Sequence, residues 1–425
     1  MDLERIYQAF SQSGLVSTDS RNIPQGAVFF ALKGPNFDGN TYAKEALTNG
    51  AIAAVVDDSA LANEENLIFV PDVLEALQAL SLMHRKAMGT TIIGLTGSNG
   101  KTTSKELMHA VLKQSFDVLA TEGNLNNHIG VPLTLLRLKP SHQVAIVEMG
   151  ANGIGQIEEL AALAQPDYGY ITNFGKAHLE GFGSEEGVVI GKSELYQQLH
   201  ATNGTAIVNA DDPKQIKQSA GINRVLFGTQ GDVQITTGIS DEGLVYADYY
   251  GMRIQSQLTG DYNQSNVAAA IAVGVMFDMP LDKIDAGISG YVPTNNRSQW
   301  CTVGGVRVLL DAYNANPTSV EAALKSFAQV PGEKWVVLGD MLELGNYSEE
   351  EHQRIADLAA SLSFEKVLLV GPHFSKAASP LVELFESTNA VADYLSNQKI
   401  NEPLSILLKG SRGMKMESLL SCFEK

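Results

Sequence analysis

The sequence predicts an α/β protein with three domains: a small N-terminal α/β unit, a central domain on a mostly parallel sheet, and a C-terminal doubly wound, Rossmann-like domain. Its 425 residues are too many for one ordinary hydrophobic core. Short apolar runs alternate with segments of helical periodicity, and this pattern restarts twice. We therefore predict domains over residues 1–87, 88–298 and 299–425.

The first segment has three short apolar runs that are typical of strands, at 27–32, 51–56 and 67–70. Helical periodicity lies around 41–49 and 72–88. Strands and helices alternate here, so we expect a small α/β unit.

The central segment alternates apolar strands with helical stretches, which indicates a parallel sheet with crossover helices. The strands are expected at 90–93, 144–147, 168–172, 205–209 and 225–227. A β-rich interval at 232–258 then leads into an apolar helix at 266–276. We assign both to the central domain.

After a stretch with Pro and Asn at 292–297, the pattern starts again. Strands are expected at 307–310, 335–338, 366–370 and 404–408, with helices between them. In a doubly wound domain, the residues just after the strand ends face the ligand. Those residues are Asp311, Asp340, Gly371 and Lys409.

Composition excludes several classes of function. The net charge of −18 and the lack of Lys/Arg runs argue against nucleic-acid binding. The N-terminus lacks the pattern of a signal peptide, and no apolar stretch approaches the roughly 20 residues that span a bilayer, so we expect no membrane insertion. The cysteines, Cys301 and Cys422, match no metal-ligand spacing. We expect a cytoplasmic monomer.

The segment Gly94-Leu-Thr-Gly-Ser-Asn-Gly-Lys-Thr-Thr103 lies between an apolar strand and a helix expected at 104–113. Glycine lets the backbone approach phosphate oxygens, Lys101 adds a positive charge, and Thr102 offers a hydroxyl to Mg²⁺. The strict P-loop pattern has glycine in place of Leu95. Even so, the order of strand, loop and helix favours a triphosphate-binding P-loop over an ordinary glycine turn. The expected contacts are Gly97, Ser98, Asn99, Gly100, Lys101, Thr102 and Thr103.

Glu148 ends the apolar strand at 144–147, in the same domain as the P-loop. A carboxylate that organises Mg²⁺ belongs at such a place. The alternative is a glutamate that caps a strand for structural reasons. The neighbouring P-loop favours the metal.

Two further side chains of the central segment have chemistry to offer. His178 lies with Glu180 in a glycine-rich stretch at 173–184, where it could bind metal, accept a proton, or be a hydrogen-bonded bystander. Lys192 lies on a helix near Glu194, and an ordinary surface lysine is the alternative there.

Neutral and cationic polar groups suggest substrate contacts. Asn126 and Asn127 could orient a phosphate or a carboxylate, or could form a turn. The loop 311–317 holds more polar groups than a turn requires, among them Tyr313, Asn314 and Asn316. After the last strand, Lys409 and Arg412 lie among glycines, as in a site for an anion.

Together these motifs resemble the Mur ligase family of ATP-dependent amide-forming enzymes, and the likeness extends through all three segments. The family's phosphate loop reads Thr-Gly-x-Asn-Gly-Lys-Thr, which Thr96-Gly-Ser-Asn-Gly-Lys-Thr102 matches, and this accounts for Leu95. Further marks are Thr18-Asp-Ser-Arg21, Phe29-Phe-Ala-Leu-Lys-Gly34, Glu148-Met-Gly150, Ala177-His-Leu-Glu180, Tyr313-Asn-Ala-Asn-Pro317, Leu338-Gly-Asp-Met-Leu-Glu-Leu-Gly345 and Lys409-Gly-Ser-Arg412.

The resemblance implies roles for single residues. Lys101 would bind phosphate, Thr102 and Glu148 would bind one Mg²⁺, His178 would bind a second, and Lys192 is the family lysine that is carbamylated in several members and then helps to hold metal. Nucleotide contacts are implied for Asn263, Asn266, Arg297 and Asp311. Substrate contacts are implied for Ser20, Arg21 and Lys33 in a UDP-sugar site, and for Asn126, Asn127, Tyr313, Asn314, Asn316, Lys409 and Arg412. The chain departs from the family at Tyr262 and Asn40, where histidine is usual.

The likeness is strongest to members that join D-alanyl-D-alanine to a UDP-N-acetylmuramoyl-tripeptide. Such a ligase uses ATP to convert the acceptor carboxylate into an acyl phosphate, which the amine then attacks. The resemblance also implies domain closure, with linkers near 85–90 and 295–303. The alternatives are another Mur-family amino-acid ligase, a folyl-polyglutamate or cyanophycin synthetase, or a P-loop ATPase that acts as a switch.

Overall fold

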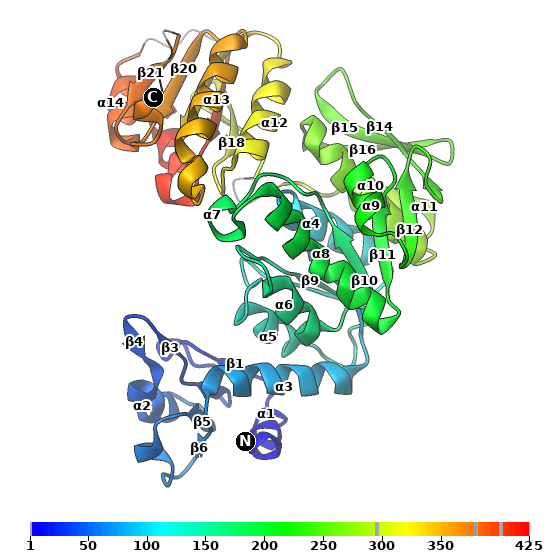
Figure 1. Ribbon diagram of the computed structural model, residues 1–425, viewed down its shortest axis with the longest axis vertical. Helices are drawn as coiled ribbons and strands as arrows, with labels where there is room; N and C mark the ends of the chain where they lie inside the picture. The colour runs from blue at the N-terminus through cyan, green and yellow to red at the C-terminus, as the bar shows by residue number, and fades with distance from the viewer. Residues whose placement is uncertain (1, 294–296, 378, 380, 399–402, 425) are drawn as a thin grey trace.

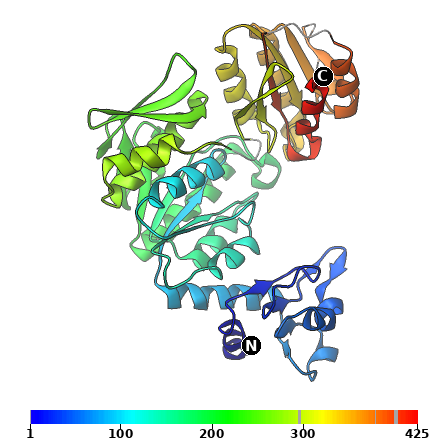
Figure 2. The same cartoon turned by 180° about the vertical axis from the view of Figure 1, so that it is seen from behind.

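The computed structural model describes residues 2–293, 297–377, 379, 381–398 and 403–424. It confirms the three-domain α/β fold, with the central domain between the other two in both views (Figures 1 and 2). The boundaries at 87/88 and 298/299 stay predictions. In the described part of the chain, no helix has the length and apolar character needed to cross a membrane.

The first domain is built on a four-stranded parallel sheet in the order β1-β2-β5-β6. Its strands are β1 (Val16–Ser17), β2 (Val28–Phe30), β5 (Ala53–Val56) and β6 (Leu67–Phe69), with a small hairpin of β3 (Lys33–Gly34) and β4 (Phe37–Asp38). Its helices are α1 (Leu3–Phe10), α2 (Ala43–Thr48) and α3 (Val73–Met88). Every residue of β2 and β5 is buried, as the unbroken apolar runs predict for strands covered on both faces.

Helix α3 connects the first domain to the central one. Its N-cap, Asp72, accepts a hydrogen bond from the Glu75 backbone N–H (2.8 Å), and the helix continues to Met88. The Arg85 guanidinium donates to the carbonyl oxygen of Ala164 in the central domain (3.0 Å). The expected linker at 85–90 is therefore mostly helix, and domain closure about it stays a prediction.

The central domain contains a seven-stranded sheet in the order β13-β12-β11-β10-β7-β9-β8, parallel at every pairing. Its strands are β7 (Thr91–Thr96), β8 (Val118–Ala120), β9 (Val144–Glu148), β10 (Tyr168–Ile171), β11 (Thr205–Asn209), β12 (Asn223–Gly228) and β13 (Val233–Gln234). A separate antiparallel sheet holds β14 (Thr236–Ile239), β15 (Leu244–Tyr249) and β16 (Met252–Thr259).

Eight helices of the described chain accompany these sheets. They are α4 (Lys101–Leu112), α5 (Gly130–Leu135), α6 (Gln156–Ala164), α7 (Leu179–Phe182), α8 (Glu185–Thr202), α9 (Pro213–Gln218), α10 (Gln264–Met276) and α11 (Leu281–Ser289). Helix α4 starts three residues earlier than we expected, because it begins directly after the left-handed Gly100. The P-loop thus runs straight into a helix N-terminus. Because β7 pairs with β9, Glu148 at the end of β9 lies next to this loop.

The C-terminal domain holds a six-stranded sheet in the order β17-β18-β22-β19-β20-β21. The strands are β17 (Gln299–Val303), β18 (Val306–Asp311), β19 (Glu333–Gly339), β20 (Lys366–Val370), β21 (Glu383–Phe385) and β22 (Leu404–Lys409), with helices α12 (Pro317–Ala328), α13 (Ser348–Ser361) and α14 (Thr388–Ser396). We missed β17, an antiparallel edge strand without a fully buried residue. Strands β18 and β22 pair so that Asp311 lies beside Lys409.

Candidate active site between the central and C-terminal domains

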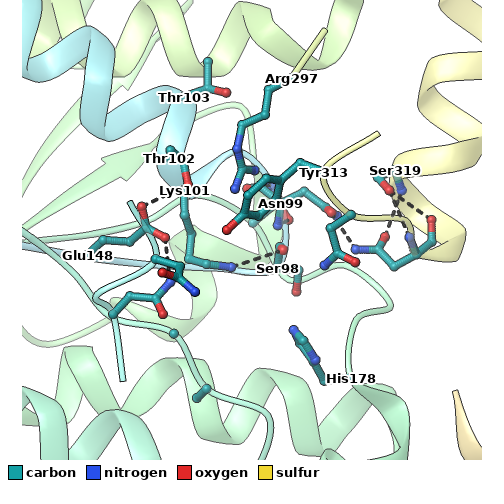
Figure 3. A pocket seen from close by; sticks show the side chains of 18 of the residues that line it. Ser98, Asn99, Lys101, Thr102, Thr103, Glu148, His178, Arg297, Tyr313 and Ser319 are labelled. Carbon is teal, nitrogen blue, oxygen red and sulfur yellow. Dashed lines mark hydrogen bonds between the residues drawn. The ribbon is translucent and has the colours of Figure 1, made fainter. Parts of the chain in front are cut away.

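A pocket of about 900 Å³ lies between the central and C-terminal domains (Figure 3). It gathers most of the residues that we singled out from the sequence, from widely separated parts of the chain to one surface. They are Ser98, Asn99, Gly100, Lys101, Thr102, Thr103, Asn126, Asn127, Glu148, His178, Asn263, Asn266, Arg297, Asp311, Tyr313, Asn314, Asn316, Lys409 and Arg412.

The P-loop forms one wall of this pocket, and its backbone requires glycine. Gly97 has φ +141°, and a Cβ there would lie 1.9 Å from the Thr172 hydroxyl oxygen. Gly100 has φ +80°, and a Cβ there would lie 2.6 Å from an oxygen of Asn266. Positive φ and close packing together exclude larger residues, so the backbone stays open to a ligand.

Lys101 turns back over the P-loop. Its Nζ donates to the carbonyl oxygen of Gly97 at 2.7 Å. Burial lowers the pKa of Lys101, the Glu148 carboxylate opposes this change, and Arg297 adds to it. An ammonium group in such surroundings gains from the arrival of an anion, which would compensate its charge.

Glu148 is held in one orientation at the end of β9. One carboxylate oxygen accepts from the Thr102 hydroxyl (3.0 Å), and the other accepts from the Asn126 side-chain amide (2.8 Å). The backbone N–H of Glu148 donates to Thr121 Oγ1 (2.9 Å). A hydroxyl and a carboxylate beside a phosphate loop are donors suited to Mg²⁺.

The two asparagines at the start of α10 support the P-loop from behind. Asn266 accepts a hydrogen bond from the Ser104 hydroxyl (2.9 Å) and donates to Asn263 Oδ1 (2.8 Å). Asn263 donates in turn to the carbonyl oxygen of Thr259 (2.7 Å). Both line the pocket, so they could shape it even where they make no ligand contact.

Two further pairs of side chains line the pocket. The Arg297 guanidinium lies 3.7 Å from the centre of the Tyr313 ring, a cation–π contact. Lys409 Nζ donates to Asp311 Oδ2 at 2.5 Å. We expected Lys409 to offer its charge to an anionic ligand, but that charge is matched by Asp311.

The Lys409→Met variant should lose stability, because it leaves the Asp311 carboxylate without its cation. The side chains of Lys409 and Asp311 are only 2% and 15% exposed, so we expect a loss of about 3 kcal/mol in the free energy of unfolding. Both tryptophans of the chain, Trp300 and Trp335, lie in this domain, so urea unfolding followed by their fluorescence measures it. The exposed Lys376→Met is the matched control, and equal losses in both variants would contradict the prediction.

His178 has a partner that we did not anticipate. It has φ +52°, and its Nδ1 contacts a carboxylate oxygen of Glu343 from the C-terminal domain. The hydrogen bond from His178 lowers the pKa of Glu343. Glu343 also lines the pocket and has φ +63°, unusual for a residue other than glycine. The motif at 338–345 contained this residue, but nothing in the sequence indicated which domain it would face.

Lys192 is not the surface lysine that we held as the alternative. It is completely buried, its Nζ donates to the carbonyl oxygen of Ala151 (3.1 Å), and it lies 5.0 Å from the centre of the Phe182 ring. Burial lowers the pKa of Lys192 well below its usual value, and Lys101 adds to this. Lys192 is not among the residues that line the pocket, although Ala151 is.

Some of the expected site residues lie elsewhere. Ser20, Arg21 and Lys33 are in the first domain, where Arg21 pairs with Asp19 (2.8 Å) and Lys33 with Asp57 (2.8 Å). They do not line the pocket, and neither does Gly97, whose backbone oxygen instead binds Lys101.

Two strand-end residues of the C-terminal domain have no place in the pocket either. Asp340 is buried and accepts hydrogen bonds from the backbone N–H groups of His373 and Phe374, both at 3.0 Å. A Cβ on Gly371 would lie 2.3 Å from Asp340, so this glycine makes room for the carboxylate. The expectation that both face a ligand is wrong, because they stabilise their own loop.

Thr102 and Glu148 fit a Mg²⁺ ion that would be bound partly by the protein and partly by phosphate oxygens. In the described chain, no three His, Cys, Asp or Glu side chains gather into a metal-binding group. Mg²⁺ commonly takes one or two protein oxygens and completes its shell with phosphate and water, which suits Thr102 and Glu148. The two residues implied for a second metal ion have protein partners in this structure: His178 contacts Glu343, and Lys192 bonds to Ala151.

Three family models match consecutive parts of the chain: "Mur ligase family, catalytic domain" over 14–85, "Mur ligase middle domain" over 95–274, and "Mur ligase, glutamate ligase domain" over 296–412. The UDP-N-acetylmuramoyl-tripeptide–D-alanyl-D-alanine ligase of Bacillus subtilis (strain 168) is 36% identical over 421 residues, which cover 95% of this chain and 92% of the relative. The enzyme of that name from Escherichia coli (strain K12) is 34% identical over 96% of this chain and 93% of its own length.

Solved structures agree. MurF from Acinetobacter baumannii has a TM-score of 0.89 at 32% identity and covers 96% of this chain and 93% of its own. The MurF ligase from Thermotoga maritima in complex with ADP has a TM-score of 0.87 at 28% identity and covers 96% and 97%. Similarity at this level over nearly the whole chain shows that the protein belongs to the Mur ligase family.

Proposed function

We propose that this chain joins D-alanyl-D-alanine to a UDP-N-acetylmuramoyl-tripeptide at the expense of ATP, in the synthesis of peptidoglycan precursors. The observation that carries the proposal is the shared pocket, which places the P-loop opposite the polar loop 311–317 of the C-terminal domain. Relatives with this activity in their name match nearly the full chain. Cytoplasmic location and a monomeric state stay predictions.

Amide formation needs help because a carboxylate repels nucleophiles and its oxygen leaves poorly. When bound, ATP with Mg²⁺ would supply the phosphoryl group that makes the carboxylate reactive. Lys101 would attract the phosphate oxygens, while Thr102 and Glu148 would hold the metal. The side-chain amide of Asn126 donates a hydrogen bond to the Glu148 carboxylate, so the carboxylate is held in place before the substrates arrive.

The other site residues divide by the part of the substrates that they would bind. Ser20, Arg21 and Lys33 of the first domain would bind the UDP-sugar part of the acceptor. Asn263, Asn266, Arg297 and Asp311 would surround the nucleotide, and Asn127, Tyr313, Asn314, Asn316 and Arg412 would face the peptide substrates. Lys409 would act through Asp311, to which it bonds.

We further propose that Lys192 is carbamylated and then contributes, with His178, to a second metal site. Only an unprotonated amine reacts with carbon dioxide, and the buried surroundings of Lys192 favour that form by lowering its pKa. The Lys192→Arg variant should lose a carbamate signal in ¹³C NMR after incubation with ¹³C-bicarbonate. It should also lose at least about tenfold in activity. An unchanged carbamate signal would contradict the assignment.

Phosphate release across a panel of substrates tests the proposed activity. The acceptors are UDP-N-acetylmuramoyl-tripeptides with lysine or diaminopimelate in third position, and the amines are D-alanyl-D-alanine, D-alanine and L-alanine. We expect one phosphate for each amide formed, and release only when an acceptor and D-alanyl-D-alanine are both present. Release with a single amino acid would favour another ligase of the family, and release without an acceptor would favour an ATPase switch.

A further inference from the structure

The segment 172–178 of the central domain contacts the P-loop through several hydrogen bonds. The Asn173 side chain makes two hydrogen bonds with the backbone of Asn99. Its Oδ1 accepts from the Asn99 N–H (3.1 Å), and its Nδ2 donates to the Asn99 carbonyl oxygen (2.9 Å). The Ser98 hydroxyl donates to the carbonyl oxygen of Gly175 (2.8 Å). A shift of this segment would therefore move the P-loop.

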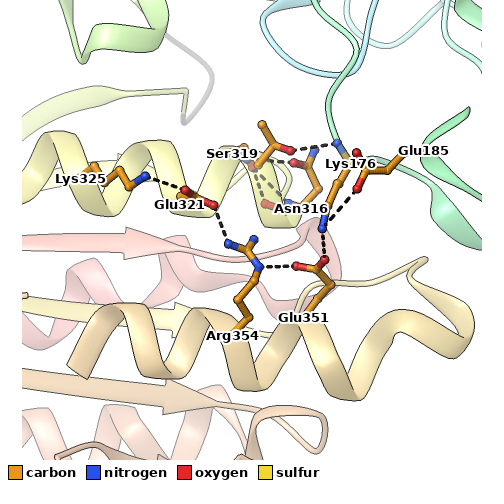
Figure 4. Close-up of polar contacts among 9 residues, drawn as sticks. Lys176, Glu185, Asn316, Ser319, Glu321, Lys325, Glu351 and Arg354 are labelled. Carbon is orange, nitrogen blue, oxygen red and sulfur yellow. Dashed lines mark hydrogen bonds and ion pairs between the residues drawn. The ribbon is translucent and has the colours of Figure 1, made fainter. Parts of the chain in front are cut away.

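The same segment is attached to the C-terminal domain through Lys176. Its backbone N–H donates to the Thr318 hydroxyl on α12 (2.9 Å). Its Nζ donates to Glu351 Oε1 on α13 (2.6 Å), as Figure 4 shows. Two residues before Thr318, Asn316 at the N-cap of α12 donates to Asn99 Oδ1 (2.7 Å). P-loop, segment and C-terminal domain thus meet at one junction.

The ion pair at this junction is sheltered from solvent. The Glu351 side chain is only 4% exposed and that of Lys176 is 33% exposed. Burial by itself would raise the pKa of Glu351, but hydrogen bonds from Lys176 and Arg354 outweigh it and lower that pKa. The carboxylate is therefore charged and depends on both cations. Arg354 belongs to α13 itself (Nε to Oε2, 2.7 Å), so Lys176 is the partner that comes from another domain.

Lys176 has a second carboxylate within reach. Glu185 of the central domain lies 3.4 Å from the same Nζ, and its side chain is 50% exposed. If the C-terminal domain moved away, Lys176 could keep this partner, whereas Glu351 would lose one of its cations. The junction thus stabilises the arrangement in which the two domains are in contact.

We propose that Lys176 is a positioning residue: by pairing with Glu351 it fixes segment 172–178, and with it the P-loop, in the position that the two joined domains require. The inference rests on the proposed function, since it assigns the residue a part in that reaction. Lys176 touches no reacting group in this scheme. It acts through Asn173 and Asn99.

The test combines K176M, E351Q and the double variant in the full chain, with K176R as the conservative replacement. We expect K176M and E351Q each to lower kcat/KM for D-alanyl-D-alanine by about tenfold, and the double variant to lose no more than either one, because the two side chains act as a pair. K176R should keep most of the activity. K325M is the control, because Lys325 pairs with Glu321 (2.7 Å) inside the same C-terminal network and its side chain is 60% exposed.

A second readout does not depend on turnover. With ADP and Mg²⁺ bound, K176M should have a larger radius of gyration in small-angle X-ray scattering than the unaltered chain and K325M. Additive losses in the double variant, an equal loss in K325M, or an unchanged radius would overturn the proposal. A chain that makes no amide at all but still expands in K176M would instead contradict the proposed function. Thermal unfolding confirms that each variant is folded.

Discussion

The Lys101→Ala variant should release phosphate about a thousandfold more slowly than the unaltered chain, with both substrates present at saturation. The Lys101 ammonium is the cation of the P-loop, and burial lowers its pKa although the Glu148 carboxylate opposes this change, so protein groups compensate its charge only in part. Attraction between such a group and phosphate is strongest where charge develops during the transfer. Initial rates of phosphate release measure the loss.

The fold should survive this change, because Lys101 donates only to carbonyl groups of its own loop among the hydrogen bonds of the described chain. Thermal unfolding midpoints of the two proteins should therefore agree closely. Lys113→Ala removes an exposed lysine just after the same helix and serves as the control. A folded Lys101→Ala protein with normal turnover would refute the role of this lysine.

The Glu148→Gln variant should lose about a hundredfold in kcat and should require more Mg²⁺ for half-maximal rate. Glutamine keeps the shape of the side chain, but it replaces a charged carboxylate oxygen by a neutral donor. The side chain is 2% exposed and already accepts from Thr102 and Asn126, so the new NH₂ group would face a donor at one of the two positions. A titration of the rate with Mg²⁺ separates lost metal affinity from lost turnover.

The matched control is Glu158→Gln, an exposed glutamate in the first turn of α6 in the same domain. It changes the net charge equally but lies outside the residues that line the pocket. Equal rates in the two variants, or a Glu148→Gln protein with an unchanged Mg²⁺ dependence, would show that the carboxylate has only a structural part.

The parallel sheets and the P-loop could be predicted because their signals are local. Unbroken apolar runs become strands covered on both faces, and the glycines of the P-loop mark positive φ angles. Placement at strand ends was enough to find Glu148, Asp311 and Lys409. The same reasoning failed for Asp340, because a carboxylate that binds a ligand and one that caps a loop follow a strand in the same way.

Contacts between domains could not be predicted, because no local pattern encodes them. Glu343 and Glu351 belong to the C-terminal domain, yet they pair with His178 and Lys176 of the central domain. The burial of Lys192 could not be predicted either. It lies on a helix with mixed polar and apolar neighbours, and only its contacts with Ala151 and Phe182 in the folded chain show that it is inaccessible. Such pairs depend on how whole domains meet.

The attachment of α3 has a consequence for the order in which ligands bind. Arg85 bonds to Ala164, and Leu136 of the central domain packs in the apolar cluster of the first domain, so these two domains form one preorganised receptor. A ligand that binds to both of them requires no rearrangement of these two domains. A ligand that also contacts the C-terminal domain must offset the entropy that is lost when that domain is fixed against them. Affinity for an acceptor alone should thus be insensitive to changes at the junction of Lys176 and Glu351.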